Sequence, residues 1–347
     1  MAENFNHINT KMIVLAREAR GITQMELAGL LGIVKGTMSK IEAGEMAFNQ
    51  EHLMQLTKLL KFDLKFFYQE GEILPPNLTY RKRDVVAQKL IIPIEAWINI
   101  YRLHIQKLLA MVAYEYKPIP VLSIEEYGTP EAIARKLRTL WKMEKGFVPD
   151  MVELLEKQKI IVKSFNFGTE RVDGRSILTD KKVPVVFLNK TLLGDRQRFT
   201  LAYELGHLVM HLFTSPAFER DVSHEANVFA AEFLMPEKEI REDLKNGKLT
   251  MTKLMELKKK WKVSMQAILY RASDLKMVTD NQKRYLLEQF NGMKIRRREP
   301  PELDIPKEHP ELLRNLITKY RAGQKMNVKE LASSFHLSED EFVERYS

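Results

Sequence analysis

The first seventy positions carry hydrophobic residues every three or four places, which is the spacing of one buried helical face. Glycines and polar residues interrupt this pattern often, so it predicts several short helices rather than a few long ones. Thr23 and Glu26 stand three apart at one such break, as in the capping box that begins a helix. The first predicted helix ends at Arg20. The other four cover about 24–31, 35–43, 50–60 and 64–68.

Beyond residue 84 the pattern alternates between helical stretches and two short β-rich runs. Apolar periodicity predicts one long helix over 84–115, and the runs at 160–167 and 183–188 predict strands with a turn at Asp173-Gly174 between them. The remaining predicted helices cover 130–141, 149–158, 199–213, 224–234, two stretches within 250–278, and a small helical end over 310–347. The pattern therefore predicts a mainly α chain with a small β-sheet, an α+β fold.

Proline pairs and a basic stretch divide the chain into parts. Pro75-Pro76 and the sequence TYRKR at 79–83 predict a linker after the first helices, and Pro300-Pro301 predicts another before the last ones. We therefore expect a five-helix domain at 1–72, a basic linker and long helix at 73–118, a central domain at 119–249 and a helical region at 250–347.

The composition is that of a globular protein, because 45% of the 347 residues are hydrophobic. No apolar run reaches the ~18 residues of a membrane span, and the beginning MAENFNHINTKM is too polar for a signal peptide. We therefore expect a cytoplasmic protein with no membrane partner. The absence of cysteine excludes disulfides and thiolate metal sites, so a zinc ion would need histidine and carboxylate ligands.

The net charge of +9 is distributed unevenly along the chain. Residues 1–70 balance at zero, residues 201–249 carry −4, and residues 250–300 carry +8. The run Lys258-Lys259-Lys260 in the basic segment predicts a solvated helix face, with contact to phosphates or an acidic partner as the alternative. Charge alone therefore does not identify a nucleic-acid partner.

The stretch ITQMELAGLLGIVKGTMSKIEAGE, at 22–45, has the plan of a helix-turn-helix. Ala28 is small where two helices would cross, Gly32 would make the turn, and Ile33 and Ile41 would fill the core. In such a pair the start of the second helix enters the major groove of DNA. The residues expected to face DNA are Lys35, Gly36, Thr37, Ser39 and Lys40, with Gln24 at a phosphate.

Through TQMELA, LLG and SKIEAGE this stretch resembles the Xre/Cro-like helix-turn-helix family over some 60 residues. The resemblance implies double-stranded operator DNA as a partner and a homodimer that binds two half-sites. Val34-Lys35-Gly36 departs from the family pattern of a serine cap and a glutamine, which affects base contacts more than phosphate contacts. A bundle kept only for dimerisation is the alternative.

The stretch FTLAYELGHLVMH, at 199–211, has the spacing of a zinc-peptidase helix with one altered position. That chemistry needs two imidazoles four residues apart, a third ligand, and a carboxylate that takes a proton from the metal-bound water. Glu204 and His207 stand where the pattern requires a base and a ligand, but Tyr203 occupies the first ligand position. Glu225, 18 residues beyond His207, is the candidate third ligand.

The phrases DRQRFTLAYELGHLVMH and EANVFAAEFLMP resemble the paired signatures of the ImmA/IrrE family of zinc metallopeptidases, and weaker likeness extends over most of the chain. The resemblance implies that Glu204 is the catalytic glutamate, here vestigial, and that His207 and Glu225 are metal ligands. Because a neutral phenol is a poor zinc ligand, Tyr203 predicts an impaired enzyme with no zinc or weakly bound zinc. A site rebuilt with His211 or His224, or an engineered Tyr203 in an active parent, are alternatives.

The resemblance to long members of that family that carry an Xre domain implies a gene located in a toxin–antitoxin operon, a prophage or a mobile element. We therefore predict an antitoxin-like transcription regulator that represses its own operon and neutralises a partner protein, a cognate toxin. An active zinc-dependent endopeptidase that cleaves a repressor or partner protein is the first alternative, and a scaffold with no role at DNA is the second.

Overall fold

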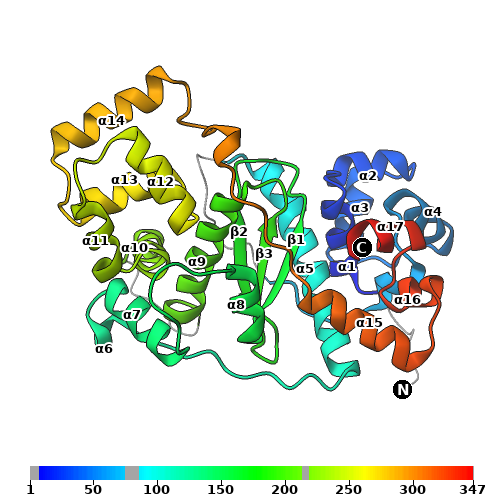
Figure 1. Ribbon diagram of the computed structural model, residues 1–347. Helices are drawn as coiled ribbons and strands as arrows, with labels where there is room; N and C mark the ends of the chain where they lie inside the picture. Colours follow the sequence, from blue (N-terminus) through cyan, green and yellow to red (C-terminus); the bar gives the residue numbers. More distant parts are fainter. Residues whose placement is uncertain (1–7, 75–85, 213–218, 347) are drawn as a thin grey trace.

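The computed structural model describes residues 8–74, 86–212 and 219–346, and it is mostly helical with one three-stranded sheet (Figure 1). The predicted α+β class is therefore confirmed. The predicted linker residues, Pro75-Pro76 and 79–83, lie outside the described residues. In the part that is described, no helix combines the length and apolar character needed to cross a membrane.

The first five elements follow the predicted pattern closely. Thr23 caps its helix in a capping box, and Gly32 adopts a positive φ of 68° at the turn before the third helix. The last of the five is a 3₁₀ helix rather than an α-helix. The elements are α1 (Thr10–Ala19), α2 (Gln24–Leu30), α3 (Lys35–Glu42), α4 (Gln50–Leu60) and η1 (Leu64–Tyr68).

One long helix, α5 (Gln88–Met111), joins the N-terminal helices to the sheet (Figure 1). Its Trp97 donates a hydrogen bond of 2.9 Å to the carbonyl of Ala19 at the end of α1. One turn later Tyr101 stacks on Phe187 of the sheet, with ring centroids 6.1 Å apart. The helix therefore shares one apolar core with both neighbours.

The sheet has the strand order β1-β3-β2, with β1 parallel and β2 antiparallel to β3. Successive residues of β3 alternate between two cores, since Val185 and Phe187 face α5 whereas Val186 and Leu188 face the opposite layer. The sheet therefore separates the two cores. The strands are β1 (Ile161–Phe165), β2 (Gly174–Leu178) and β3 (Pro184–Asn189).

The predicted turn at Asp173-Gly174 is wrong, because Gly174 begins β2. A Cβ atom at Gly174 would lie 2.8 Å from Cγ2 of Thr200 on the neighbouring helix. Glycine therefore serves a close approach of helix and strand here, and not a turn.

The layer on the other side of the sheet is built around a pair of buried helices, α9 (Gly194–Met210) and α10 (Val222–Leu234). Gly206 allows them to pack closely, since its Cβ would lie 3.0 Å from the ring of Phe229. Three shorter helices precede the pair and complete the layer: α6 (Ile124–Tyr127), α7 (Pro130–Leu140) and α8 (Met151–Lys157).

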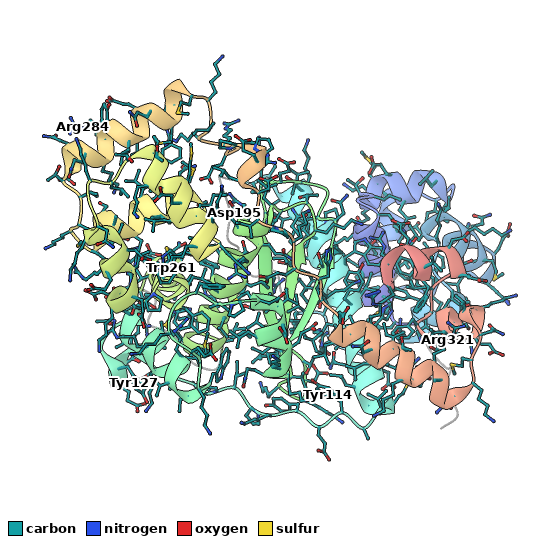
Figure 2. All side chains as sticks on the ribbon, viewed as in Figure 1. Tyr114, Tyr127, Asp195, Trp261, Arg284 and Arg321 are labelled. Carbon is teal, nitrogen blue, oxygen red and sulfur yellow. The ribbon has the colours of Figure 1, made fainter. Side chains whose placement is uncertain are left out.

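Four further helices and a 3₁₀ turn extend this layer. The pair predicted within 250–278 is confirmed as α12 (Met251–Trp261) and α13 (Met265–Asp274). Two additional helices, α11 (Glu237–Lys245) and α14 (Asp280–Gly292), are highly polar and bury only two residues each. Arg284 extends outward from α14 (Figure 2), and η2 (Pro301–Leu303) follows.

The last three helices, α15 (Leu312–Gln324), α16 (Val328–Ser334) and α17 (Glu339–Tyr346), return to the N-terminal helices (Figure 1). Leu337 forms an antiparallel bridge with Phe62, and Glu341 forms an ion pair of 3.0 Å with Arg20. Residues 250–347 thus contribute to both cores, and the predicted domain division stays a prediction.

Candidate functional site

The α9 helix places Tyr203, Glu204 and His207 in the interior between the sheet and α10. Their exposed fractions are 1%, 2% and 4%, so none of the three lies on the molecular surface. Tyr203 and His207 are four residues apart and therefore share one side of the helix. The helix bearing the peptidase-like pattern is formed as the sequence predicts.

Glu204 is oriented by the sheet. The hydroxyl of Ser176 on β2 donates a hydrogen bond of 2.7 Å to Oε2 of Glu204. Such a bond favours one position of a buried carboxylate. A carboxylate at the position of the expected catalytic base is therefore present and fixed.

Tyr203 contacts His207 through its ring. The two rings meet edge to face, with centroids 4.7 Å apart and an angle of 77° between their planes. The phenol thus occupies the volume beside His207 that an imidazole would share with a metal ion in a two-histidine pair.

His207, His211 and Glu225 form a hydrogen-bonded row. The two Nδ1 atoms of the histidines lie 2.9 Å apart, and Nε2 of His211 lies 2.9 Å from Oε2 of Glu225. Burial, together with the neighbouring His211, lowers the pKa of His207 to about 3, and burial also lowers that of His211. Both imidazoles are therefore neutral at pH 7.

Neutrality fixes the proton positions in this row. His211 donates from Nε2 to the Glu225 carboxylate, so its Nδ1 accepts from Nδ1 of His207. Nε2 of His207 is then a lone-pair acceptor, and this buried atom has no hydrogen-bond partner among the described residues. It is the one feature of the row that suits a further ligand.

Glu225, the expected third ligand, is bound by an arginine. Nε and Nη2 of Arg220 donate to its two carboxylate oxygens at 2.9 and 2.8 Å. Burial acts to raise the pKa of Glu225, but the hydrogen bonds from Arg220 and His211 outweigh it and lower the pKa. Arg220 also pairs with Glu125 at 2.9 Å.

As arranged here, the side chains do not fit a three-ligand zinc site. Tyr203 offers a ring edge, and both oxygens of Glu225 already accept hydrogen bonds. Across residues 8–74, 86–212 and 219–346, no three histidine, aspartate or glutamate side chains converge to hold a metal. The structure brings His211 into the row, whereas His224 is exposed and lies outside it.

Arg220 is the residue that sequence reasoning missed. It precedes α10 and stands five residues before Glu225, which is not a helical pairing distance. Its only sequence signal is a basic residue shortly before the helix that carries an expected ligand.

The residues expected to face DNA lie at the start of α3. Lys35, Gly36, Ser39 and Lys40 are exposed, and Thr37 is half-buried. Val34 caps α3 without a side-chain hydrogen bond, in agreement with the departure noted in the sequence. The side-chain amide of Gln24, which is expected at a phosphate, donates a hydrogen bond of 2.8 Å to Glu42 in the absence of DNA.

Comparison with known proteins gives two domain matches. Residues 13–67 match a helix-turn-helix family, and residues 155–273 match the IrrE N-terminal-like domain family. The second match contains the whole of α9 and α10 and all the residues of the hydrogen-bonded row. The chain therefore joins an Xre-like helix-turn-helix domain to an IrrE-like domain.

One relative is the radiation response metalloprotease IrrE of Deinococcus radiodurans, which is 32% identical over 106 residues. The matched segment is 27% of this chain and 32% of that protein's length. The similarity therefore concerns one domain and not the whole of either protein.

Proposed function

We propose that this chain is an antitoxin-like transcription regulator that represses its own operon and neutralises a partner protein, a cognate toxin. On this proposal the partner binds an IrrE-like domain whose catalysis is impaired. The observation that carries the impairment is the state of Glu225, whose carboxylate is held by Arg220 and His211.

The positive charge of Arg220 takes the place beside Glu225 that a metal ion has in an intact site. A carboxylate with a bidentate guanidinium partner is electrostatically satisfied, so the domain needs no metal to be stable. A tyrosine at position 203 also leaves the site without its first ligand. Losing a residue that binds the metal directly costs more than the ~10–100-fold in metal affinity lost when a residue that only orients a ligand is changed. We therefore propose no zinc or only weakly bound zinc, with His207 and Glu225 as remnants of a metal site and Glu204 as a vestigial base.

The proposed DNA contacts come from a homodimer in the cytoplasm. The helix-turn-helix domain has no net charge over 1–70, so one copy has little non-specific attraction for phosphate. Two copies on paired half-sites would supply affinity and position α3 in two successive major grooves. Lys35 and Lys40 would contact phosphates, and Gly36, Thr37 and Ser39 would approach bases.

The DNA-binding part is tested with a fluorescent duplex from the promoter of the chain's own operon. We expect Lys35→Ala to weaken binding at least threefold and to reduce its salt dependence, because one phosphate contact is lost. Lys58→Ala is the matched control, since Lys58 is an exposed lysine on α4 of the same domain. Unchanged affinity in both variants, or no shift of the duplex at low salt, would favour the scaffold alternative.

The antitoxin part is tested by expressing the neighbouring protein of the operon alone and with this chain. Growth arrest that is relieved by both wild type and Glu204→Gln would support neutralisation by binding. Relief that disappears with Glu204→Gln would indicate catalysis instead.

The second candidate function is an active zinc-dependent endopeptidase, and one observation favours it. Nε2 of His207 is a buried acceptor without a hydrogen-bond partner among the described residues, and Glu204 is retained nearby on the same helix. Stoichiometric zinc in purified protein, with chelator-sensitive cleavage of a partner, would establish this candidate.

A further inference from the structure

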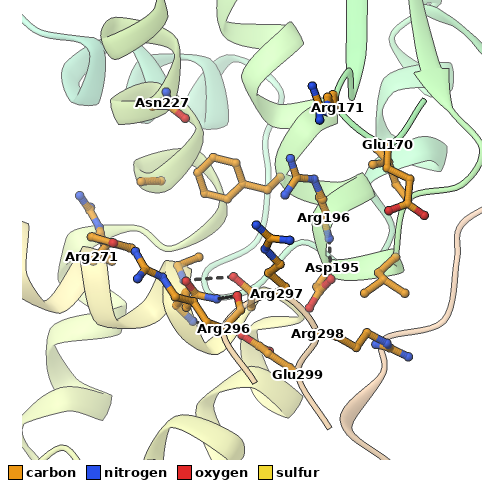
Figure 3. Close-up of a pocket in the computed structure, with 18 of the residues that line it drawn as sticks. Glu170, Arg171, Asp195, Arg196, Asn227, Arg271, Arg296, Arg297, Arg298 and Glu299 are labelled. Carbon is orange, nitrogen blue, oxygen red and sulfur yellow. Dashed lines mark hydrogen bonds between the residues drawn. The ribbon is translucent and has the colours of Figure 1, made fainter. Parts of the chain in front are cut away.

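A cavity of about 1420 Å³ lies outside the row of His207, His211 and Glu225. It is lined by the start of α9, one side of α10, part of α13, the residues before β2 and the segment 296–299 after α14 (Figure 3). The volume exceeds the ~300–1,000 Å³ of ordinary small-molecule pockets. It suits an extended chain segment rather than a compact metabolite.

Arginines dominate one part of the lining. Arg171, Arg196, Arg296, Arg297 and Arg298 come from three separate parts of the chain (Figure 3). Arg196 is paired with Asp173, and Arg298 with Asp304. Arg171 and Arg297 have no ion-pair partner among the described residues, so their charges are available to a ligand.

A buried lysine holds the arginine segment in place. Lys258 is 1% exposed and binds both Asp195, at the start of α9, and Glu299, the latter at 2.8 Å. The expectation of a solvated face is therefore wrong for Lys258, because two carboxylates draw it inside. The backbone of Arg296 is fixed as well, since its carbonyl accepts a hydrogen bond from Gln266.

The rest of the lining is of a different character. Glu131 of α7 and Asp274 of α13 add negative charge, and Phe199 and Tyr270 add aromatic surface. A nucleic acid carries an anionic group at every unit, so these carboxylates would repel it. A polypeptide can place acidic side chains at the arginines and neutral or basic ones at the carboxylates.

We propose that this cavity binds an extended acidic peptide segment of the partner protein. Carboxylates of the segment would form hydrogen-bonded ion pairs with Arg171 and Arg297, whose planar guanidinium groups match a carboxylate. Because Lys258 and Gln266 pre-order the 296–299 segment, little conformational entropy would be lost on binding.

The position of the cavity relates it to the peptidase-like helix. Arg196 and Phe199 line the cavity from α9, and Tyr203 is the next residue on the same side of that helix. Tyr203 is 1% exposed and does not itself line the cavity, so a bound segment would lie one helical turn away from the residue that contacts His207.

This inference rests on the proposed function, since it names where and by what chemistry the partner binds. The test uses the full chain and a fluorescein-labelled octapeptide in which glutamate alternates with serine, with fluorescence anisotropy measured at low salt. The matching lysine–serine peptide is the charge control. Arg297→Glu and Arg171→Glu are the test variants, and Arg284→Glu is the matched control, because Arg284 is an exposed arginine of the same basic segment on α14 (Figure 2).

We expect the glutamate peptide to bind and the lysine peptide not to bind. Each test variant should weaken binding about tenfold, while Arg284→Glu leaves it within about twofold and unfolding temperatures stay equal. Equal loss in Arg284→Glu would mean diffuse charge attraction and would overturn the proposal, as would no binding of the glutamate peptide.

A single-stranded oligonucleotide that binds in the same arginine-dependent way, in place of the peptide, would also overturn it. These assays contain neither operator DNA nor zinc. If the peptide does not bind, the proposals of repression and toxin neutralisation are unaffected. If repression or toxin neutralisation is not observed, a positive peptide-binding result remains valid.

Discussion

On the proposed function, Tyr203 stands where a metal-site imidazole would be expected, and its ring fills the space beside His207. Arg220 then supplies positive charge to Glu225 from the other side. The two residues act together, since the ring excludes a ligand and the guanidinium satisfies the carboxylate that remains. A substitution at Tyr203 alone therefore leaves Glu225 paired with Arg220.

Tyr203→His is expected to increase zinc binding. Wild type should contain well below one zinc per chain by elemental analysis. Tyr203→His should gain zinc, and Tyr203→His combined with Arg220→Gln should approach one per chain, because Glu225 is then released from its arginine. Tyr203→Phe is the control and should remain like wild type; one zinc per chain in wild type would show that our interpretation of Tyr203 is wrong.

Arg220→Gln alone is expected to destabilise the IrrE-like domain by about 1–3 kcal/mol, because a mostly buried carboxylate loses its charged partner. The side chain of Glu225 is 15% exposed, whereas the exposed pair Arg241–Glu237 is more than one-third exposed on both sides. Arg241→Gln should therefore change stability by less than about 0.5 kcal/mol. Thermal unfolding of both variants measures the difference, and equal effects would contradict a special role for Arg220.

At the scale of the element, the helix-turn-helix was predictable because its signals are local. A capping box at Thr23, a glycine turn and a short apolar period each involve residues that are neighbours in sequence. The strand β2 was missed because Gly174 has a purpose that only the packed helix α9 reveals. Helices α11 and α14 were missed because each buries only two residues, too few to give a clear period.

The candidate site, like the helix-turn-helix, was predictable from sequence only where its residues are near neighbours along the chain. The spacing of Glu204 and His207 within α9, and of His211 at its C-cap, is a local property, so their placement followed from sequence. The contact of Arg220 with Glu225 depends on the path of the chain before α10, which has no periodic signal. Burial of Lys258 likewise depends on carboxylates 63 and 41 residues away.

Val34→Ser is expected to stabilise α3 by about 1 kcal/mol, because serine can cap the helix and valine cannot. Val34 is 71% exposed and forms no side-chain cap, so little apolar packing is lost. Slower hydrogen exchange of amides in α3 would show the effect, and Val34→Ala is the control without a capping oxygen. Equal exchange in the serine and alanine variants would contradict the capping account.

Docking of α16 and α17 is expected to weaken in acid. Burial lowers the pKa of His104 to about 3, and burial with the nearby Lys107 lowers that of His336 to about 4. Both pKa values lie below the ordinary value of histidine, which is near 6.5. At pH values between the folded-state pKa values and about 6.5, the unfolded chain therefore binds more protons than the folded protein does. Stability is therefore full above about pH 6.5 and is lost as the pH falls toward 3 to 4.

Limited proteolysis of α16 and α17 across that pH range measures the loss. The groups near His336 are Lys107, Asp63 and Lys65, and Nδ1 of His104 contacts the hydroxyl of Tyr346 at 2.7 Å. His336→Asn should flatten part of the profile, because asparagine tolerates the positive φ of 57° and does not titrate. An unchanged profile in this variant would exclude His336 as a source.

At the scale of the whole molecule, each of the two cores beside the sheet combines segments that are far apart in the sequence. One contains the N-terminal helices, α5 and the last three helices, whereas the other contains α9 to α14. The long helix α5 contacts both the helix-turn-helix domain and the sheet, so a single element links the two.

Leu337→Ala is expected to destabilise the first core by about 2–4 kcal/mol, because Leu337 is 3% exposed. Hydrogen exchange should rise in α1 to α4 as well as in α16 and α17, while α9 and α10 keep their protection. Leu286→Ala on α14 is the matched control in the second core. It should raise hydrogen exchange in the second core, while α1 to α4, α16 and α17 keep their protection. Increased exchange confined to α16 and α17 would show that the N-terminal helices are stable without them.

The contact between Arg20 and Glu341 spans 321 residues of sequence, which has a consequence for synthesis. A ribosome adds about 5–20 residues per second, so the N-terminal helices leave it roughly 15 to 60 seconds before their last partners. During that interval the surface around Phe62 stays exposed to water, to chaperones and to proteases. The packing of the N-terminal helices is therefore completed only after the IrrE-like domain and the last helices have been translated.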